Sequence, residues 1–243
     1  EKKDMDEMYS DWVAKRALKT KAIKLNPDNP FQWASGYRMP IYNDNRMLLS
    51  SYMSRKDVVE GFVKLIEESV VNRDIVIAGT STAGIPWAAG VANFRCNPMI
   101  YIRDKPKDHG LRNQIEGIDA ESDLEGKTAV VIEDLISTGG SSVAAVQAVR
   151  DAKGNCNHCF SIFSYGFKEA LEMFEGKRPY DKEKTKFLTT PCEVKSILTY
   201  DKLLQVAKDT GYLNAEQVKL LEDWRADPWN WGANHGFPKV EKK

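Results

Sequence analysis

The sequence has little of what marks secreted or membrane-spanning chains. It contains four cysteines in 243 residues, Cys96, Cys156, Cys159 and Cys192, too few and too scattered for a disulfide framework in a chain of this size. No apolar run approaches the roughly 20 residues needed to cross a bilayer, and residues 1–26 carry charges throughout. These absences predict a cytoplasmic protein with no membrane segment.

An excess of charge of either sign is also missing. The 35 Lys and Arg residues balance 35 Asp and Glu residues, so the formal net charge is zero. A chain without a positive excess has no long-range field to hold it on nucleic acid or on an anionic membrane. We therefore predict neither as a partner, and we expect any anion-binding site to be local. The sequence also contains no internal repeat or low-complexity tract.

Cys156 and Cys159 have the two-residue spacing of a zinc or redox site. No second ligand pair with matching spacing follows, and residues 160–163 read as a strand. Because two ligands cannot close a tetrahedral zinc site, we interpret the pair as small buried side chains beside the start of a strand.

Short apolar runs and helical patterns alternate through the middle of the chain. The runs read as buried strands, and the amphipathic or apolar patterns between them read as helices. Strand and helix in regular succession predict an α/β fold whose mainly parallel central sheet is flanked by helices. The predicted strands are residues 75–79, 99–102, 129–132 and 159–163, and the predicted helices are residues 55–72, 85–94 and 141–152.

The length and the 42% hydrophobic content are enough for one main domain with a small attached lobe. We expect the α/β core at residues 55–199. Residues 1–54 lack strong periodicity and are expected to form a small lobe over the ligand-binding edge of the sheet. Residues 200–243 are expected to pack on the core, with a helical pattern over 200–225 that residues 227–232 end. Within that end, Trp229 and Trp231 are interpreted as packing residues.

The third apolar run leads into two acids and then a turn rich in glycine and hydroxyl groups. In parallel sheets, ligands bind beyond the carboxyl ends of the strands. The turn at residues 137–141 can aim backbone N–H groups at a phosphate on the N-terminus of the next helix. Two carboxylates beside a phosphate alone would be unfavourable, because like charges repel. Glu133 and Asp134 fit such a site if they accept hydrogen bonds from sugar hydroxyls and a divalent cation nearby offsets their charge. A ribose 5-phosphate offers hydroxyls to the acid pair and a phosphate to the turn. The alternative interpretation is an ordinary strand-to-helix turn with an acidic helix cap.

This turn lacks the Gly-Lys-Ser/Thr of a P-loop and the spaced glycines of a dinucleotide site. In the form Glu-Asp-Leu-Ile-Ser-Thr-Gly-Gly-Ser, residues 133–141 resemble the phosphoribosyl pyrophosphate (PRPP) signature of type I phosphoribosyltransferases, and the orotate enzymes in particular. The resemblance implies the type I phosphoribosyltransferase fold with a small N-terminal hood lobe. It also implies an orotate phosphoribosyltransferase, which makes orotidine 5'-monophosphate and pyrophosphate for pyrimidine synthesis. PRPP contacts are assigned by resemblance to Glu133, Asp134, Leu135, Ile136, Ser137, Thr138, Gly139, Gly140 and Ser141.

Within that assignment, Glu133 and Asp134 hold the ribose hydroxyls, the hydroxyl-rich turn cradles the 5-phosphate, and Ser137 lies near orotate.

Residues 101–117 leave the second predicted strand with three cations and a histidine within seven residues. Taken alone, such a segment is either a solvated charged loop or a lid, but it resembles the catalytic loop of the orotate enzymes.

By that resemblance Arg103, Lys107 and His109 contact PRPP and are catalytic, with Lys107 and His109 acting on the departing pyrophosphate. Many family members carry a second lysine where this chain has Asp104, which leaves open whether Lys105 replaces it.

Residues 29–46 resemble the family motif that lies over the base, and this assigns Ile41 and Tyr42 to orotate binding. Several members have a lysine where this chain has Ala34, and the alternative is a purely hydrophobic lobe. Residues 79–86 are small and hydroxyl-bearing and suit the pyrophosphate end through backbone N–H groups. Some relatives carry a lysine there, which this chain lacks.

The resemblance further implies Mg²⁺ as a cofactor, held mainly through PRPP and not by direct protein ligands, and a homodimer whose subunits share lid residues. One rival is a PRPP enzyme that uses a purine base or uracil, but residues 40–46 and 107–110 favour orotate. Another is a transcription regulator on the same fold, which the neutral charge and the lack of a recognisable helix-turn-helix or basic arm disfavour. We expect no second, decarboxylating barrel domain in a chain of this length.

Overall fold

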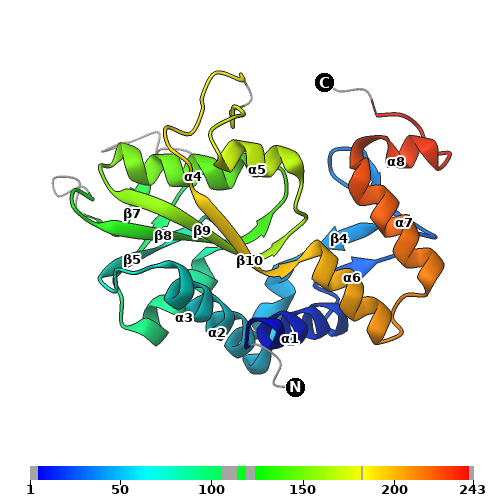
Figure 1. The fold of residues 1–243 in the computed structure, drawn as a ribbon, viewed down its shortest axis with the longest axis horizontal. Coiled ribbons are helices and arrows are strands. Elements are labelled where there is room, and N and C mark those ends of the chain that lie inside the picture. Colours follow the sequence, from blue (N-terminus) through cyan, green and yellow to red (C-terminus); the bar gives the residue numbers. More distant parts are fainter. Residues whose placement is uncertain (1–4, 105–113, 119–123, 182, 241–243) are drawn as a thin grey trace.

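A six-stranded sheet forms the centre of the computed structural model, which describes residues 5–104, 114–118, 124–181 and 183–240 (Figure 1). The strand order is β10-β9-β8-β5-β6-β7, and every neighbouring pair is parallel except β6 with β7. The strands are β5 (Ile75–Thr80), β6 (Met99–Ile102), β7 (Ile115–Glu116), β8 (Thr128–Ile136), β9 (Asn155–Ser164) and β10 (Glu193–Thr199).

The four predicted strands are confirmed as β5, β6, β8 and β9, whereas β7 and β10 were not predicted. The third prediction ended at Ile132 and is too short. Strand β8 keeps its parallel pairing with β9 as far as Ile136, which is paired with Ser164. The acid pair therefore belongs to the strand itself and not to the turn after it.

Both faces of the sheet are buried. Successive side chains of a strand point to opposite faces, so they join different hydrophobic clusters. In β5, Ile75 and Ile77 join one hydrophobic cluster, while Val76 and Ala78 join the other. Helices α4 (Gly140–Asp151) and α5 (Lys168–Phe174) cover one face, and α2 (Tyr52–Ser69) and α3 (Ile85–Arg95) cover the other (Figure 1). This double burial explains why the strands read as continuous apolar runs.

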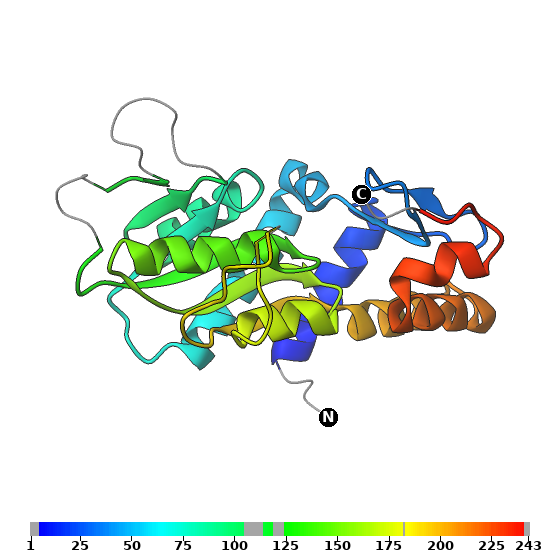
Figure 2. The ribbon, with the colours of Figure 1, turned by 90° about the horizontal axis from the view of Figure 1, so that it is seen from above.

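The N-terminal segment is more regular than the sequence indicated. Residues Met5–Lys19 form helix α1, which lies along α2 and α6 (Figure 2). Its periodicity is hard to see because polar residues interrupt the buried Val13, Ala14, Ala17 and Leu18. Two small antiparallel ladders follow, and a 3-10 helix leads into α2. They comprise β1 (Ile23–Leu25) with β4 (Ile41–Asn43), β2 (Phe31–Gln32) with β3 (Arg38–Met39), and η1 (Asn45–Ser50).

The predicted helical tail is three helices, α6 (Tyr200–Asp209), α7 (Ala215–Ala226) and α8 (Pro228–Asn234). The helical pattern breaks at residues 210–214, where Gly211 has φ +69°. Residues 227–232 do not end the helical structure, because α8 begins inside them. These helices pack beside the two small N-terminal ladders at one end of the molecule (Figure 1).

Aromatic side chains join the two chain ends into one lobe. The Trp224 ring lies 6.3 Å from Trp33 and 5.5 Å from Tyr165, and its Nε1 donates to the Met39 sulfur at 2.9 Å. Trp229 packs against Tyr37 at 5.2 Å, and Trp231 is 2% exposed. The interpretation of both C-terminal tryptophans as packing residues agrees with these contacts.

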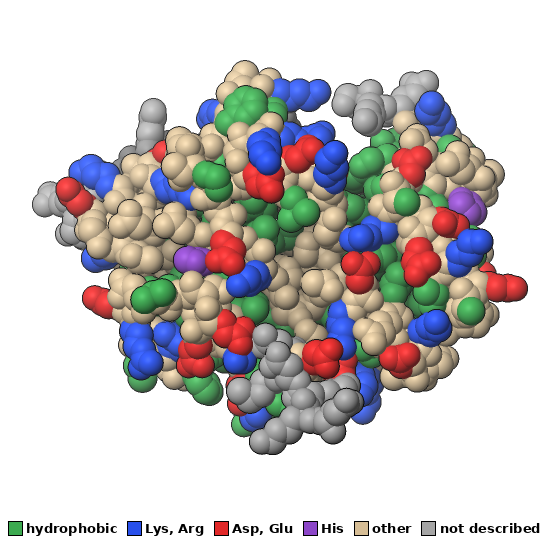
Figure 3. Space-filling model, viewed as in Figure 1, with side chains coloured by type: hydrophobic (Ala, Val, Ile, Leu, Met, Phe, Trp, Pro, Cys, Tyr) green, Lys and Arg blue, Asp and Glu red, His purple; other side chains and the backbone are tan. Residues whose placement is uncertain are grey.

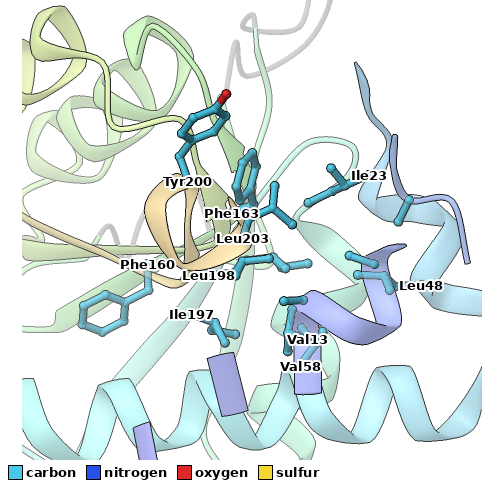
Figure 4. Packing of buried hydrophobic residues seen from close by; sticks show 14 of the residues in the cluster. Val13, Ile23, Leu48, Val58, Phe160, Phe163, Ile197, Leu198, Tyr200 and Leu203 are labelled. Carbon is cyan, nitrogen blue, oxygen red and sulfur yellow. The ribbon is translucent and has the colours of Figure 1, made fainter. Parts of the chain in front are cut away.

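Beneath this lobe, one continuous core connects the ends of the chain to the sheet. Figure 4 shows side chains of α1, β1, η1 and α2 meeting those of β9, β10 and α6. Cys156 and Cys159 lie buried in β9, in the core on the opposite face, as the sequence interpretation proposed. Burial raises the pKa of Cys156 to about 12, and no metal-binding group of three or more His, Cys, Asp or Glu occurs among the described residues.

Lys and Arg side chains are interspersed with Asp and Glu over the face seen in Figure 3, as expected for a chain with balanced charge. Across the described ranges, every helix is too short or too polar to cross a membrane.

We predict that Trp224→Ala destabilises the protein by about 3–5 kcal/mol, because it empties the centre of the aromatic cluster between the chain ends. Urea unfolding followed by far-UV circular dichroism measures the loss. Trp12→Ala is the matched control, since Trp12 is 38% exposed, and it should cost clearly less. Equal losses for the two variants would show that the cluster does not hold the lobe.

Candidate active site

A cavity of about 440 Å³ lies at the carboxyl ends of β5, β6 and β8. Several segments of the core and residues 43–46 of the N-terminal lobe form its wall, so residues distant in the sequence converge on one space. The described residues that line it are Asn43, Asp44, Arg46, Thr80, Ser81, Thr82, Ala83, Ile102, Arg103, Asp104, Gln114, Glu133, Asp134, Leu135, Ser141, Ala144 and Ala145.

Glu133 is almost entirely buried, and three protein donors occupy its carboxylate. Oε1 accepts from Thr80 Oγ1 at 2.8 Å and from the Asp134 backbone N–H at 2.9 Å, and Oε2 accepts from Ser142 Oγ at 3.1 Å. Burial, followed by the charge of Asp134, raises the pKa of Glu133 from its ordinary 4.5 to about 8. Burial also raises the pKa of Asp134. The less buried Asp134 is thus the better placed of the two to meet a ligand.

Beyond Ile136 the chain turns into α4 through residues 137–139. Gly139 has φ +88°, which favours glycine, and an added Cβ would lie 3.1 Å from the Ala170 Cβ. The first turn of α4 leaves backbone N–H groups without helical acceptors, at the positive end of the helix dipole. Ser141 lines the cavity from this turn, so the N-terminal end of α4 borders the cavity.

The turn between β5 and α3 closes another side of the cavity. Ser81 N–H donates to the Ile102 carbonyl at 2.8 Å, which ties the turn to β6. An added Cβ at Gly84 would lie 2.4 Å from Thr80 Oγ1 and 2.5 Å from the Ile132 carbonyl, so only glycine fits there. The peptide bond between Ser81 and Thr82 is cis. Residues 80–83 thus present small side chains and backbone to the cavity.

Arg103 lies where β6 leaves the sheet, at the cavity wall. Its backbone N–H donates to the Gln114 carbonyl at 2.8 Å, and Gln114 Nε2 returns a bond to the Arg103 carbonyl at 3.0 Å. Its guanidinium lies 3.6 Å from Glu116, and among the described residues its Nε has no acceptor. The predicted catalytic residues Lys107 and His109, like Lys105, lie outside the described residues.

A second pocket, of about 340 Å³, adjoins the cavity, with Asn43 and Leu135 common to both. Aromatic side chains and small polar groups form its wall, and neither Lys nor Arg is among its described lining residues. Trp33 is fixed there by a hydrogen bond from Nε1 to the Ile41 carbonyl at 2.8 Å. The lining residues are Trp33, Ala34, Ser35, Tyr42, Asn43, Leu135, Ser137 and Tyr165.

The structure therefore gathers seven of the twelve predicted site residues that it describes into two adjoining spaces. Tyr42 and Ser137 line the second pocket, but Ile41 is fully buried and lines neither space, so its side chain belongs to the core. Ile136 is also buried, and Thr138, Gly139 and Gly140 contribute the backbone of the turn and do not line the cavity.

The sequence analysis did not single out Asn43, Asp44, Arg46 or Tyr165 as individual site residues. Two signals could have indicated them. The polar run at residues 43–46 comes directly after an apolar strand, and Tyr165 directly follows β9 at the ligand edge. Asp44 and Arg46 form a two-bond ion pair, with distances of 2.7 and 3.0 Å.

We predict that the free energy of unfolding of the substrate-free protein falls as the pH rises from about 4.5 to about 8. The folded state keeps the Glu133 proton over this range, whereas the unfolded state releases it. Glu133→Gln should give a shallower pH dependence and a more stable unliganded protein above about pH 8. Urea titrations in EDTA across this range check it, and identical slopes for the two proteins would contradict the buried titration.

Comparison with known proteins agrees with this geometry. The family model described as "Phosphoribosyl transferase domain" matches residues 49–187. The chain is 40% identical over 220 residues to the orotate phosphoribosyltransferase of Listeria monocytogenes serotype 4b, covering 90% of this chain and 97% of that protein. It is 42% identical over 220 residues to the Enterococcus faecalis enzyme, covering 90% and 96%.

Among solved structures, the orotate phosphoribosyltransferase of Aeropyrum pernix has the same fold. Its TM-score is 0.59 at 22% identity, over 82% of this chain and 99% of that one. The type I phosphoribosyltransferase fold predicted from the turn at residues 133–141 is thus confirmed. By the extent and identity of these matches, this chain belongs to the orotate phosphoribosyltransferase family.

Proposed function

We propose that this protein transfers the phosphoribosyl group of PRPP to orotate, giving orotidine 5'-monophosphate and pyrophosphate in pyrimidine synthesis. The observation that carries the proposal is the pairing of two adjoining spaces at one sheet edge. One has an acid pair and two anion-binding turns, and the other has aromatic walls of a size suited to a planar base. A ribose lying between them places its C1 atom at their junction.

In the larger cavity, the Asp134 carboxylate accepts hydrogen bonds from the ribose hydroxyls, and Glu133 supports it from below through the Asp134 backbone N–H. The turn at residues 137–141 and the first turn of α4 hold the 5-phosphate. Residues 80–83 and Arg103 face the pyrophosphate, with Lys107 and His109 assigned to the same anion by family resemblance. Positive charge developing on the ribose is stabilised by the acids, and negative charge on the leaving group by the cations.

Mg²⁺ fits this donor set as a partner of PRPP and not as an ion held by a protein cage. The described residues contain no group of three or more His, Cys, Asp or Glu that could hold a metal alone. The cavity wall does contain two neighbouring acids, Glu133 and Asp134. Bound with PRPP, the ion neutralises charge on the leaving pyrophosphate. Asp134 is the residue that would face it, because the Glu133 oxygens already accept three hydrogen bonds.

We also propose a cytoplasmic homodimer in which the subunits share lid residues. All four cysteines are free, which suits a reducing compartment. Beside the cavity, η1 and the start of α2 expose Met47, Tyr52 and Met53, which are 48%, 68% and 44% exposed. An apolar surface at this position suits contact with a second subunit close to the site.

The direct test is loss of orotate absorbance in the presence of PRPP and Mg²⁺, run beside adenine, hypoxanthine and uracil. We expect turnover with orotate and little with the other bases. Turnover with a purine or uracil in place of orotate would reassign the protein to another branch of the PRPP enzymes.

We predict that Asp134→Asn weakens PRPP binding by at least about tenfold, because it removes a charged acceptor from the ribose hydroxyls. Isothermal titration calorimetry with PRPP and Mg²⁺ measures the affinity. Asp209→Asn serves as a control, since Asp209 is an exposed carboxylate at the end of α6 and lines neither space. Normal PRPP affinity in Asp134→Asn would exclude the ribose role.

We predict that Lys107→Ala lowers kcat by about a hundredfold or more while orotate still binds, because its charge acts on the departing pyrophosphate. Steady-state kinetics at saturating PRPP measure it. An unchanged kcat would remove Lys107 from the mechanism.

A further inference from the structure

Tyr165 is the most deeply buried polar side chain among the described residues that line the second pocket, with 2% of its surface exposed. It directly follows β9, and aromatic side chains pack around its ring. These neighbours are Trp33, Phe163, Phe167, Tyr200 and Trp224, with ring centroids 5.1 to 6.4 Å from that of Tyr165. The packing fixes the ring and leaves the hydroxyl as the polar end of a buried side chain.

The Tyr165 hydroxyl makes no hydrogen bond with any described residue. It is also not one of the unpartnered atoms that the protein shuts off from solvent, as the Asn43 Oδ1 is. Because almost all of Tyr165 is covered and the residue lines the second pocket, we infer that its hydroxyl opens into that pocket.

Other polar groups of the same aromatic cluster have partners within the protein. The Tyr200 hydroxyl donates to the Leu221 carbonyl at 2.9 Å, and the Trp33 Nε1 donates to the Ile41 carbonyl at 2.8 Å. Buried hydroxyls are normally paired in this way, because an unpaired one is unfavourable. The unpaired hydroxyl of Tyr165 therefore indicates a ligand that supplies the partner.

The hydroxyl would act as a neutral donor. Burial, followed by the neighbouring Tyr42 phenol, raises the pKa of Tyr165, so the side chain keeps its proton at neutral pH. Neither Lys nor Arg is among the described lining residues of this pocket. A donor in this setting suits an oxygen atom of the ligand as its acceptor.

The position of Tyr165 identifies which oxygen of the base it meets. The inference rests on the proposed function, in which the ribose lies in the larger cavity and N1 of orotate lies at the junction lined by Asn43 and Leu135. Tyr165 lines the second pocket and not the larger cavity, so it faces the part of the base away from the ribose. In the orotate ring the C4 carbonyl lies directly across from N1, whereas the carboxylate is on C6, next to N1.

We propose that Tyr165 is a specificity-determining residue whose hydroxyl donates a hydrogen bond to the C4 oxygen of the base. This bond lies on the opposite side of the ring from N1, so it leaves the direction of the new bond to C1 free. A base without an oxygen at this position leaves the buried hydroxyl unpaired, which is how Tyr165 contributes to the choice of base. The C4 oxygen is unchanged by the transfer, so the contact holds substrate and product alike and acts on binding more than on kcat.

Tyr165→Phe keeps the aromatic ring and removes the hydroxyl. We expect the KM for orotate to rise about tenfold, while kcat and the KM for PRPP stay within about twofold of wild type. Without ligands, the urea midpoint of the variant should be at least as high as that of wild type, because the hydroxyl has no protein partner to lose. Weaker substrate binding together with undiminished stability separates a ligand contact from a structural role.

Two nucleotides test which atom accepts the bond. Orotidine 5'-monophosphate and uridine 5'-monophosphate both carry the C4 oxygen, but the uridine nucleotide has no carboxylate. Measured as inhibitors of the wild-type protein and of Tyr165→Phe, both should show an inhibition constant about tenfold higher in the variant.

Tyr200→Phe is the matched control, with the same substitution in the same aromatic core (Figure 4). Tyr200 lines neither the larger cavity nor the second pocket, and its hydroxyl is bonded to the Leu221 carbonyl. We expect this variant to have a lower urea midpoint and an unchanged KM for orotate, which is the reverse of the result expected for Tyr165→Phe.

An unchanged KM for orotate in Tyr165→Phe would overturn the inference, as would a lower urea midpoint in that variant. If orotidine 5'-monophosphate binds more weakly and uridine 5'-monophosphate does not, the hydroxyl meets the carboxylate and the assignment to the C4 oxygen is wrong. A wild-type protein that does not consume orotate would contradict the proposed function itself, so that failure is distinguishable from failure of the Tyr165 contact.

Discussion

The two adjacent acids Glu133 and Asp134 lie near the end of a buried parallel strand. Their burial is unfavourable by itself, and hydrogen-bond donors from neighbouring elements surround them. A buried charge is costly unless it is hydrogen-bonded or paired. Thr80, Ser142 and the backbone of Asp134 donate to Glu133, and Asn45 donates to the Asp134 carbonyl. These donors come from β5, α4, β8 and η1, so the acid pair ties four elements together.

This constraint also links the two lobes. Residues 43–46 leave the small N-terminal ladder and enter the wall of the cavity, where Asn45 holds the main chain of the acid pair. The neighbouring β2–β3 ladder packs against the C-terminal helices, with Trp224 on Met39 and Trp229 on Tyr37. The chain ends therefore help to position the second pocket, although the acid pair and the turn at residues 137–139 lie in the middle of the sequence.

Charge is distributed unevenly between the two spaces. Asp44, Arg46, Arg103, Asp104 and the acid pair surround the larger cavity, which suits a ligand with a sugar, a phosphate and a pyrophosphate. The second pocket offers aromatic rings, hydroxyls and amides from its described residues. In that pocket we expect shape and neutral hydrogen bonds to orient an anionic base.

The sequence by itself determined the α/β class, four of the six central strands, and the acid pair with its phosphate turn. These features are local, since a doubly buried strand needs a continuous apolar run and the turn into α4 needs glycine where φ is +88°, at Gly139. The tertiary structure decided the features that depend on contacts between segments distant in the sequence. The first four residues of strand β10, at the sheet edge, alternate between exposed and half-buried. Helix α1 has only a narrow apolar stripe among charged residues. Ile41 faces the core, while its neighbour Tyr42 lines the second pocket. Asn43 donates to Asn45, and Asn45 donates to the Asp134 carbonyl 89 positions further along, so only the folded chain brings these residues together.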